Sequence, residues 1–379
     1  MNFLLNKEHE MAQILFRNFA EKEVKPLAQE IDEDERFPDE TVEKMKQYGF
    51  LGIPFPKELG GQGCDTLTYV LCIEELSKVC ATTGVIVSAH TSLGADPIKK
   101  FGSPELIEKY FRPMAEGKLI GAFGLTEPNA GTDAAGQQTK AVLEGDHYVL
   151  NGSKIFITNA GKADVYVVFA MTDKSKGTRG ISAFVVEKDF PGFSVGKKEL
   201  KMGIRGSSTC ELIFENCIVP KENLLGKEGK GYGIAMKTLD GGRIGIAAQA
   251  LGIAEGALEE AVKYVKERKQ FGKSIAGFQN TQFVIADMYS KIEAAKLLTY
   301  KAALAKDSQE VFSVEAAIAK LYASETAMEV TTKVVQLFGG YGYTRDYPVE
   351  RMMRDAKITE IYEGTSEVQR MVISANVLK

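Results

Sequence analysis

The chain has 379 residues, of which 44% are hydrophobic and 26% are charged, and its formal net charge at pH 7 is -4. This composition is that of an ordinary globular protein, and the length suggests two or three structural units. The small negative charge excludes a basic field that would attract nucleic acid or an anionic membrane surface, so we expect neither partner.

No targeting or membrane-spanning segment is evident. The first twenty residues mix Lys7, Glu8, Glu10 and Arg17 among apolar side chains, which does not match the unbroken apolar core of a signal peptide. We therefore expect a cytoplasmic protein, or a mitochondrial matrix protein if a targeting peptide has been removed.

Metal and disulfide chemistry are not expected. The cysteines are odd in number and form no C-x-x-C pair, which predicts buried thiols at Cys64, Cys72, Cys80, Cys210 and Cys217. The three histidines have no H-x-x-x-H spacing and offer no metal site; they are His9, His90 and His147.

The chain up to residue 120 has the apolar periodicity of helices. In the first helix, one apolar face is expected to be buried, made of Met11, Ile14, Leu15 and Phe19. Further helices are predicted over residues 38–48, 67–79 and 85–101, which together predict an N-terminal helical bundle over residues 1–120.

Around Gly121 the apolar period changes to two. Residues 140–143 and 148–150, joined by a Glu144-Gly145-Asp146 turn, predict a hairpin, and further strands are predicted over 154–158, 165–170, 181–186 and 209–214. Because no helices separate these strands, we predict an antiparallel barrel or sandwich over residues 121–225, not a parallel sheet.

Helical periodicity returns after a glycine-rich stretch over residues 226–233, which we interpret as a linker. Helices are predicted over 244–266, 278–305 and 314–337, giving a C-terminal helical bundle over residues 226–379. The predicted fold class is thus α+β, with a β domain between two helical bundles.

Two helices near the C-terminus are predicted to meet in a sharp elbow at Glu363. The first begins behind Pro348 and stops near Tyr362, because Gly364 can adopt the left-handed conformation that ends a helix. Ser366 and Gln369 have the spacing of a capping box that starts the next helix. The elbow can direct Glu363 into a cavity, although on its own an exposed loop glutamate is the simpler interpretation.

Several nucleotide-binding and hydrolase motifs are missing. Gly272-Lys273-Ser274 is not a P-loop, because the first glycine of that motif is replaced by Glu267, and no G-x-G-x-x-G follows a strand. The turn-rich segment over residues 123–133 remains, where hydroxyls and backbone amides suit a flat heteroaromatic ring, and Phe156 on the later strand suits covering one face of it.

Taken together, these segments resemble the acyl-CoA dehydrogenase family of flavoproteins along essentially the whole chain. The resemblance is carried by seven motifs in the right order, over residues 125–133, 156–159, 240–243, 267–272, 336–342, 354–358 and 361–365. It implies FAD as the cofactor and the same plan of helices, β domain and helices.

By this resemblance, one set of residues surrounds the flavin ring, with Thr158 near its N5 atom: Phe123, Leu125, Thr126, Phe156 and Thr158. A second set reaches the pyrophosphate and adenosine of a neighbouring copy's FAD, which implies a homodimer and usually a homotetramer: Arg268, Phe271, Gln279, Gln336 and Gly340. Thr365 and Glu367 complete the cofactor's polar contacts.

The resemblance further implies that Glu363 is the base that removes the α-hydrogen of an acyl-CoA thioester, while flavin N5 accepts the β-hydrogen as hydride. Burial is expected to raise the pKa of Glu363 toward the working pH. Residues on the substrate side are Thr132, Arg243, Tyr362 and Gly364. Electrons then pass to an electron-transferring flavoprotein.

Two positions narrow the implied substrate. Branches acting on isovaleryl or long-chain substrates place the acid where this chain has Gly242, and the glutaryl branch has an arginine where this chain has Gly84. A short straight acyl chain is favoured, with butyryl-CoA converted to crotonyl-CoA or the reverse. A short-form acyl-CoA oxidase and a non-catalytic acyl-CoA or flavin-binding scaffold are the alternatives.

Overall fold

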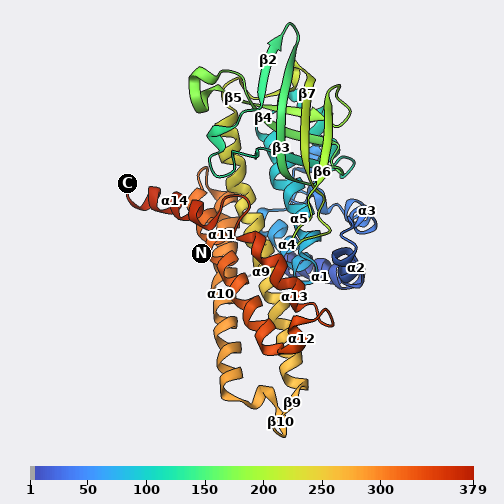
Figure 1. The fold of residues 1–379 in the computed structure, drawn as a ribbon, viewed down its shortest axis with the longest axis vertical. Helices are drawn as coiled ribbons and strands as arrows, with labels where there is room; N and C mark the ends of the chain where they lie inside the picture. Colours follow the sequence, from blue (N-terminus) through green and yellow to red (C-terminus); the bar gives the residue numbers. More distant parts are fainter. Residues whose placement is uncertain (1–4) are drawn as a thin grey trace.

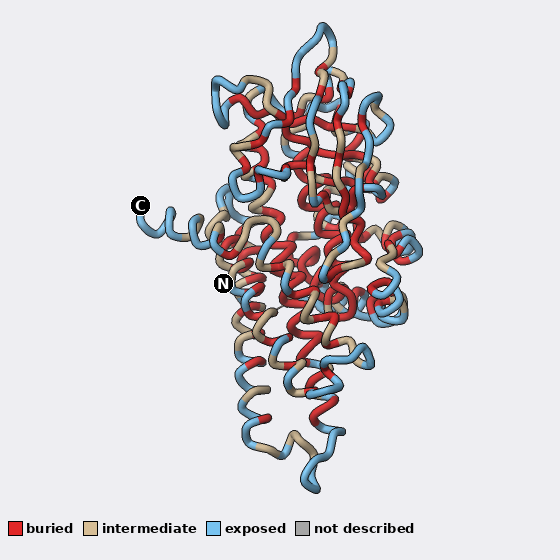
Figure 2. The backbone as a smooth tube through the Cα atoms, viewed as in Figure 1, coloured by how far each residue is buried: buried red, intermediate tan, exposed pale blue. Residues whose placement is uncertain are grey.

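The computed structural model describes residues 5–379, and Figure 1 shows an elongated molecule with the β domain at one end and long helices at the other. The N-terminal helices pack against its middle. Among the described residues, no helix is both long and apolar enough to cross a membrane. Figure 2 shows that buried residues concentrate in the middle, whereas the tips at both ends are exposed.

The N-terminal region is helical, as predicted. Its main elements are α1 (Lys7–Phe19), α2 (Ala28–Glu33), α3 (Asp39–Gln47), α4 (Thr66–Val79), α5 (Ala81–Ser88), the π-helix η5 (Ala89–Ala95), α6 (Asp96–Phe101), α7 (Pro104–Leu106) and α8 (Arg112–Ala115). Helices α4 and α5 are buried almost throughout, because each is apolar around most of its circumference.

The predicted buried face of α1 is wrong at three of its four residues, and of the four only Phe19 is buried. Met11, Ile14 and Leu15 are exposed, and the helix instead docks through His9, Phe16 and Phe19. Both phenylalanines pack against the ring of Phe50, and the His9 ring contacts Asp65 at 2.8 Å. The aromatic side chains offer more area for burial than the competing stripe does.

One cysteine also departs from the expectation, since Cys64 is exposed while the other four thiols are buried.

The β domain is one sheet of eight strands in the order β6-β7-β3-β2-β4-β5-β8, with β1 paired to β4. The strands are β1 (Gly121–Gly124), β2 (Lys140–Glu144), β3 (His147–Thr158), β4 (Val165–Met171), β5 (Ile181–Glu187), β6 (Phe193–Lys198), β7 (Thr209–Pro220) and β8 (Leu224–Leu225). The predicted hairpin is present, with Glu144 opposite His147.

The sheet is mixed, which corrects the prediction of a purely antiparallel domain. Strand β1 runs parallel to β4, and β2 meets β4 in parallel at the single pair Lys140 and Met171. The β2–β3 hairpin lies between β1 and β4 in the sequence. The chain therefore returns to β4 in the direction of β1 by a crossover that contains one short 3-10 helix, Ala134–Gly136, and no α-helix.

The C-terminal region is helical, as predicted. It contains α9 (Gly231–Glu267), α10 (Gln279–Ser308), α11 (Ser313–Phe338), α12 (Gly340–Tyr343), α13 (Val349–Thr359) and α14 (Ser366–Val377), with the short strands β9 (Lys269–Gln270) and β10 (Lys273–Ser274) between α9 and α10. The predicted linker is partly wrong, because α9 already begins at Gly231. A Cβ there would lie 2.5 Å from the Ser182 carbonyl carbon of β5, so glycine lets the helix start against the sheet.

Helix α9 is the central element and packs against both α4 and α11. Its glycines permit a close approach to α4, since a Cβ on Gly252 would lie 2.3 Å from the Glu74 carbonyl oxygen, and one on Gly256 would lie 2.2 Å from that of Lys78. The register between the two helices is therefore fixed by backbone contact.

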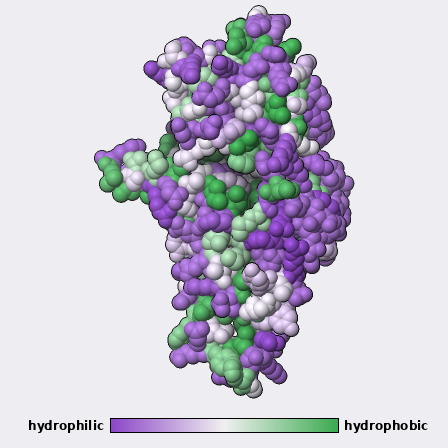
Figure 3. Space-filling model, viewed as in Figure 1, coloured by the Kyte–Doolittle hydropathy of each residue, from purple (hydrophilic) through white to green (hydrophobic). Residues whose placement is uncertain are grey.

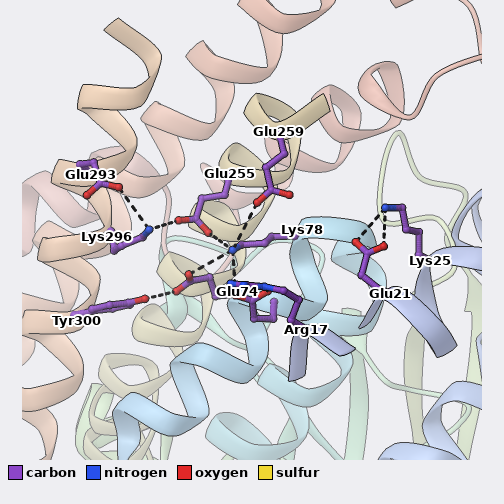
Figure 4. Close-up of polar contacts among 11 residues, drawn as sticks. Arg17, Glu21, Lys25, Glu74, Lys78, Glu255, Glu259, Glu293, Lys296 and Tyr300 are labelled. Carbon is purple, nitrogen blue, oxygen red and sulfur yellow. Dashed lines mark hydrogen bonds and ion pairs between the residues drawn. The ribbon is translucent and has the colours of Figure 1, made fainter. Parts of the chain in front are cut away.

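A cluster of buried charges lies where α4, α9 and α10 meet (Figure 4). The Lys78 ammonium contacts Glu255 at 2.8 Å and Glu75 at 3.1 Å, and the Tyr300 hydroxyl donates to Glu74 at 3.0 Å. Burial raises the pKa of Glu74 well above its usual value. Lys78 is thus the cation shared by several buried carboxylates.

We expect Lys78→Met to lower the free energy of unfolding by about 3 kcal/mol, because the substitution removes the cation that Glu75 and Glu255 share and leaves them only Arg17 and Lys296. Lys25→Met is the matched control: Lys25 pairs with Glu21 on the surface, where such pairs contribute about 0–1 kcal/mol. Urea denaturation followed by circular dichroism measures both. Equal effects of the two substitutions would contradict the assigned role of the cluster.

Candidate active site

The predicted elbow is present between α13 and α14. Helix α13 ends at Thr359, somewhat before the predicted Tyr362, and the chain reverses through Glu363 and Gly364, whose φ angles are 52° and 93°. A left-handed conformation is uncommon for a residue other than glycine, and such strained residues cluster at functional sites.

The predicted capping box is wrong in its register. Thr365 is the residue that caps α14, because its hydroxyl accepts from the backbone N–H of Val368 at 3.4 Å, and Ser366 is already helical. Gln369 does not close a capping box. Its side-chain amide instead donates to the carbonyls of Gly364 at 2.8 Å and Glu363 at 3.3 Å.

Lys320 of α11 contacts the elbow, and the sequence analysis missed it. Its ammonium group donates to the Gly364 carbonyl at 2.8 Å, and the side chain is fully buried. One signal was present: a lysine whose helical neighbours one turn away are small residues, namely Ala316, Ala317, Ala323 and Ser324. All four of these are buried.

The Glu363 side chain points inward, against α9. A Cβ built on Gly242 would lie 2.0 Å from Glu363 Oε2 and 2.8 Å from a methyl carbon of Leu93. Glu363 Oε2 is buried and has no hydrogen-bond partner among residues 5–379, although the residue as a whole is half-buried. The interpretation as an exposed loop glutamate is therefore wrong.

Burial controls the electrostatics of this carboxyl group. It raises the pKa of Glu363 to about 8, against the opposing effect of the positive charges of Lys320 and Arg243. Burial also lowers the pKa of Lys320 to about 8. Arg243 donates to Asp240 at 2.6 Å, so its charge is already paired. Such a carboxyl group can take up and release a proton near neutral pH.

The space beside Glu363 is bounded by buried groups. The Tyr362 hydroxyl donates to Gln249, whose amide donates to the Ala81 carbonyl at 3.0 Å, which ties the elbow to α9 and α5. One turn along α9 from Gly242, a Cβ on Gly245 would lie 2.3 Å from Ser88 Oγ and 2.9 Å from the Tyr69 hydroxyl.

The predicted flavin-side residues come together at the base of the β domain. The backbone N–H of Ile155 donates to the Thr126 carbonyl at 2.9 Å, next to a bulge where Phe156 has a φ of 59° and an exposed ring. This brings the segment of Leu125 and Thr126 beside the strand of Phe156 and Thr158. Phe123 lies in β1, where its ring packs against Phe169.

Lys154 is a second residue that the sequence analysis did not assign to this region. Its fully buried ammonium group donates to the Leu125 carbonyl at 3.2 Å and to Glu127 at 2.7 Å, so it fastens the loop to β3. Thr132, further along the same loop, is exposed. On the face in Figure 3, apolar side chains gather around a hollow near the middle of the molecule, below the β domain.

The second predicted cofactor set lies at the opposite end of the molecule. A groove of about 610 Å³ is lined by Arg268, Gln336 and Gly340, with the Arg268 guanidinium 5.7 Å from the Tyr341 ring centre. Phe271 and Gln279 are exposed and lie outside this lining, on the turn after β9 and at the start of α10. Glu367 is exposed in the first turn of α14.

These two regions fit opposite ends of the FAD that the resemblance implies. The exposed Phe156 ring on a strained bulge offers a surface for a flat heteroaromatic ring. Arg268 is a cation of the kind that pairs with pyrophosphate, and a Cβ on Gly340 would meet nothing within 4 Å, so the backbone there is open to a ligand.

Comparison with known proteins gives the family. Three family models match in chain order: the acyl-CoA dehydrogenase N-terminal domain over residues 6–118, the middle domain over 122–217 and the C-terminal domain over 229–378. Among curated proteins, the chain is 66% identical over 379 residues to the short-chain specific acyl-CoA dehydrogenase of Clostridium acetobutylicum, with 100% of both chains covered.

Two solved structures are similarly close. Butyryl-CoA dehydrogenase from Megasphaera elsdenii matches with 54% identity and a TM-score of 0.98, and 100% of both chains is covered. A chain in a structure described as the electron transferring flavoprotein of Acidaminococcus fermentans matches with 60% identity and a TM-score of 0.99, again over 100% of both chains. With its domain models in order and its relatives aligned from end to end, the chain belongs to the acyl-CoA dehydrogenase family, close to butyryl-CoA dehydrogenase.

Proposed function

We propose that the protein is an FAD-dependent dehydrogenase of short-chain acyl-CoA thioesters, which interconverts butyryl-CoA and crotonyl-CoA with Glu363 as the base. One observation carries the proposal: a buried carboxylate oxygen, without a hydrogen-bond partner among the described residues, is held in a strained elbow against a glycine of α9.

The chemistry follows from the position of this carboxylate. The α-hydrogen of a thioester is a weak acid, so its removal needs a base held at the α-carbon and donors for the thioester oxygen. Glu363 Oε2 has no hydrogen-bond partner within residues 5–379 that it must release before it accepts that proton. FAD, when bound, supplies the acceptor for the β-hydrogen as hydride. Among residues 5–379, the backbone N–H of Glu363 donates to no acceptor, which supports the expectation that it binds the thioester oxygen.

The position of Gly242 supports Glu363 further. The family branches that place their acid at this position would direct it from α9 toward the space that Glu363 Oε2 occupies here, because a Cβ on residue 242 lies 2.0 Å from that oxygen. Both arrangements therefore bring a carboxylate to the same place.

The side chains that pack against α9 one turn after Gly242 support a short acyl chain as the substrate. At Gly245, one turn further along α9, Ser88 and Tyr69 lie against the helix, and we propose that they limit the length of the acyl chain. The relatives from Clostridium acetobutylicum and Megasphaera elsdenii are named for short-chain and butyryl substrates.

The separation of the two cofactor regions supports an assembly of at least two copies. Helix α9 begins at the β domain and ends at Arg268, and its 37 residues span about 55 Å, far more than one FAD molecule. One FAD can meet both regions only if the second copy supplies the groove. Large exposed apolar side chains on α10 and α14, such as Phe283, Tyr289 and Met371, support a further interface in a homotetramer.

An electron-transferring flavoprotein is the proposed electron partner, since a related chain comes from a structure described as that flavoprotein.

Anaerobic mixing with butyryl-CoA, octanoyl-CoA and isovaleryl-CoA tests the whole proposal. We expect butyryl-CoA to bleach the flavin most. Equal bleaching by all three removes the short-chain assignment, rapid reoxidation by air favours an oxidase, and a protein that stays colourless with FAD favours a scaffold.

We expect Glu363→Gln to retain FAD and bind acyl-CoA, and to lower kcat by about 10²–10⁴-fold, because the amide cannot accept a proton. In the unsubstituted enzyme, kcat/KM should fall about tenfold per pH unit below a pKa of about 8, since the protonated carboxyl is not a base. Stopped-flow flavin absorbance measures both. A Gln variant that bleaches at the normal rate refutes the assignment of the base.

We expect Gly242→Ala to lower kcat by about 10²-fold, because its Cβ would displace the Glu363 carboxylate by an ångström or more. Gly233→Ala on the same helix is the control, since a Cβ there meets nothing within 4 Å. It should leave kcat unchanged. Steady-state kinetics with butyryl-CoA compare the two, and full activity of Gly242→Ala would show that the carboxylate does not act from this position.

A further inference from the structure

We propose that Lys320 is a positioning residue for Glu363: its ammonium group clamps the elbow through the Gly364 carbonyl, and its positive charge increases the fraction of Glu363 that is ionised. The inference deepens the proposed function and rests on Glu363 as the base. It concerns a residue on α11 that lies outside every motif of the sequence analysis.

The burial of Lys320 is the first observation. Lys154 and Lys320 are the two buried lysines in the part of the chain that the structure describes. Lys154 contacts the Glu127 carboxylate at 2.7 Å, whereas no carboxylate of residues 5–379 lies within 4.0 Å of the Lys320 ammonium group. A buried cation without an ion pair is costly, so its presence calls for a compensating role.

The hydrogen bond of Lys320 shows that the side chain acts on the backbone of the elbow. An ammonium group has three donors, and the one bond that Lys320 makes among residues 5–379 goes to the Gly364 carbonyl at 2.8 Å. Gln369 donates to the same carbonyl at 2.8 Å. The carbonyl directly after Glu363 is therefore held from two sides, which compensates for the left-handed conformation of that residue.

The surrounding charges leave Lys320 as the available counter-charge for Glu363. Four titratable groups face Glu363: Lys320 from α11, Arg243 from α9, Tyr69 from α4 and the adjacent Tyr362. Arg243 is paired with Asp240 at 2.6 Å. Of the acidic groups near Lys320, Glu360 contacts Lys357 at 2.6 Å and Glu367 is exposed.

The sign of the interaction is fixed by electrostatics. Burial raises the pKa of Glu363 and lowers the pKa of Lys320, while each charge favours the ionised form of the other. Removing the ammonium charge therefore makes Glu363 hold its proton to a higher pH, and less of the enzyme carries the ionised base at neutral pH. A residue that only fills space would not change this titration.

The test titrates Glu363 directly in the FAD-loaded protein, by NMR of ¹³C-carboxyl-labelled glutamate assigned with Glu363→Gln. We expect Lys320→Met and Lys320→Gln each to raise the pKa of Glu363 by about one unit. The fall of kcat/KM for butyryl-CoA at low pH should shift by the same amount, so that at pH values below the pKa of Glu363 activity is about tenfold lower than in the unsubstituted protein. Lys320→Gln keeps a donor for the Gly364 carbonyl, so it separates the charge from the hydrogen bond. Lys320→Arg should restore the normal titration.

Lys296→Met is the matched control, because it removes a largely buried lysine that pairs with Glu255 in the cluster of Figure 4. It should lower stability without moving the titration of Glu363. A Glu363 that titrates identically in the unsubstituted protein and in Lys320→Met overturns the proposal, and so does an equal shift in Lys296→Met.

A reciprocal measurement covers the case in which the neutral Lys320 variants do not fold. In lysine labelled with ¹³C at the ε position and assigned with Lys320→Arg, Lys320 should lose its proton at a lower pH in Glu363→Gln than in the unsubstituted protein. An unchanged titration overturns the proposal. Because neither NMR titration needs turnover, absence of activity toward acyl-CoA would refute the proposed function and leave this test intact.

Discussion

The contact between the Glu363 carboxylate and Gly242 of α9 is the constraint on which the site depends. It requires an elbow with left-handed residues at 363 and 364, a helix without a side chain at 242, and enough burial to keep water from Glu363 Oε2. Each requirement is costly by itself: a strained backbone, a glycine inside a helix and an unpaired polar atom. The rest of the fold compensates for these costs.

Helix α9 supplies most of this compensation. It packs against α4 and α11, so the position of Gly242 is set by contacts along the whole bundle. Gly252 and Gly256 bring its backbone against α4, and Lys78 joins the two helices through the carboxylate of Glu255. The elbow is fixed to the same helix about two turns further along, because Tyr362 donates to Gln249. A local strain at the site is thus held by non-local packing.

The sequence predicted features whose signals are local. The elbow followed from Gly364 and the helical periods beside it, and the β2–β3 hairpin followed from a turn at Gly145. Features set by distant partners were missed: β1 pairs in parallel with β4, and α1 docks through Phe16 instead of Met11. Two apolar stripes compete on α1, and the packing of its aromatic residues decides between them.

The site itself was predictable only in part, for the same reason. The motifs that carry the family resemblance contain Glu363, Phe156 and Arg268, but not the two buried lysines. Lys154 and Lys320 look like ordinary surface lysines in the sequence, because a buried ammonium group is recognisable only once the carbonyls it contacts have been placed. The cap of α14 shifted by one residue since Gln369 is used by the elbow carbonyls.

The most direct test of the central claim is a crystal structure of the protein with FAD and an unreactive butyryl-CoA analogue bound. The account predicts that a carboxylate oxygen of Glu363 lies against the α-carbon of the acyl chain, on the opposite face from the isoalloxazine ring, with Gly242 beneath it. An acyl chain bound elsewhere, or a Glu363 side chain turned away into solvent, would contradict the account.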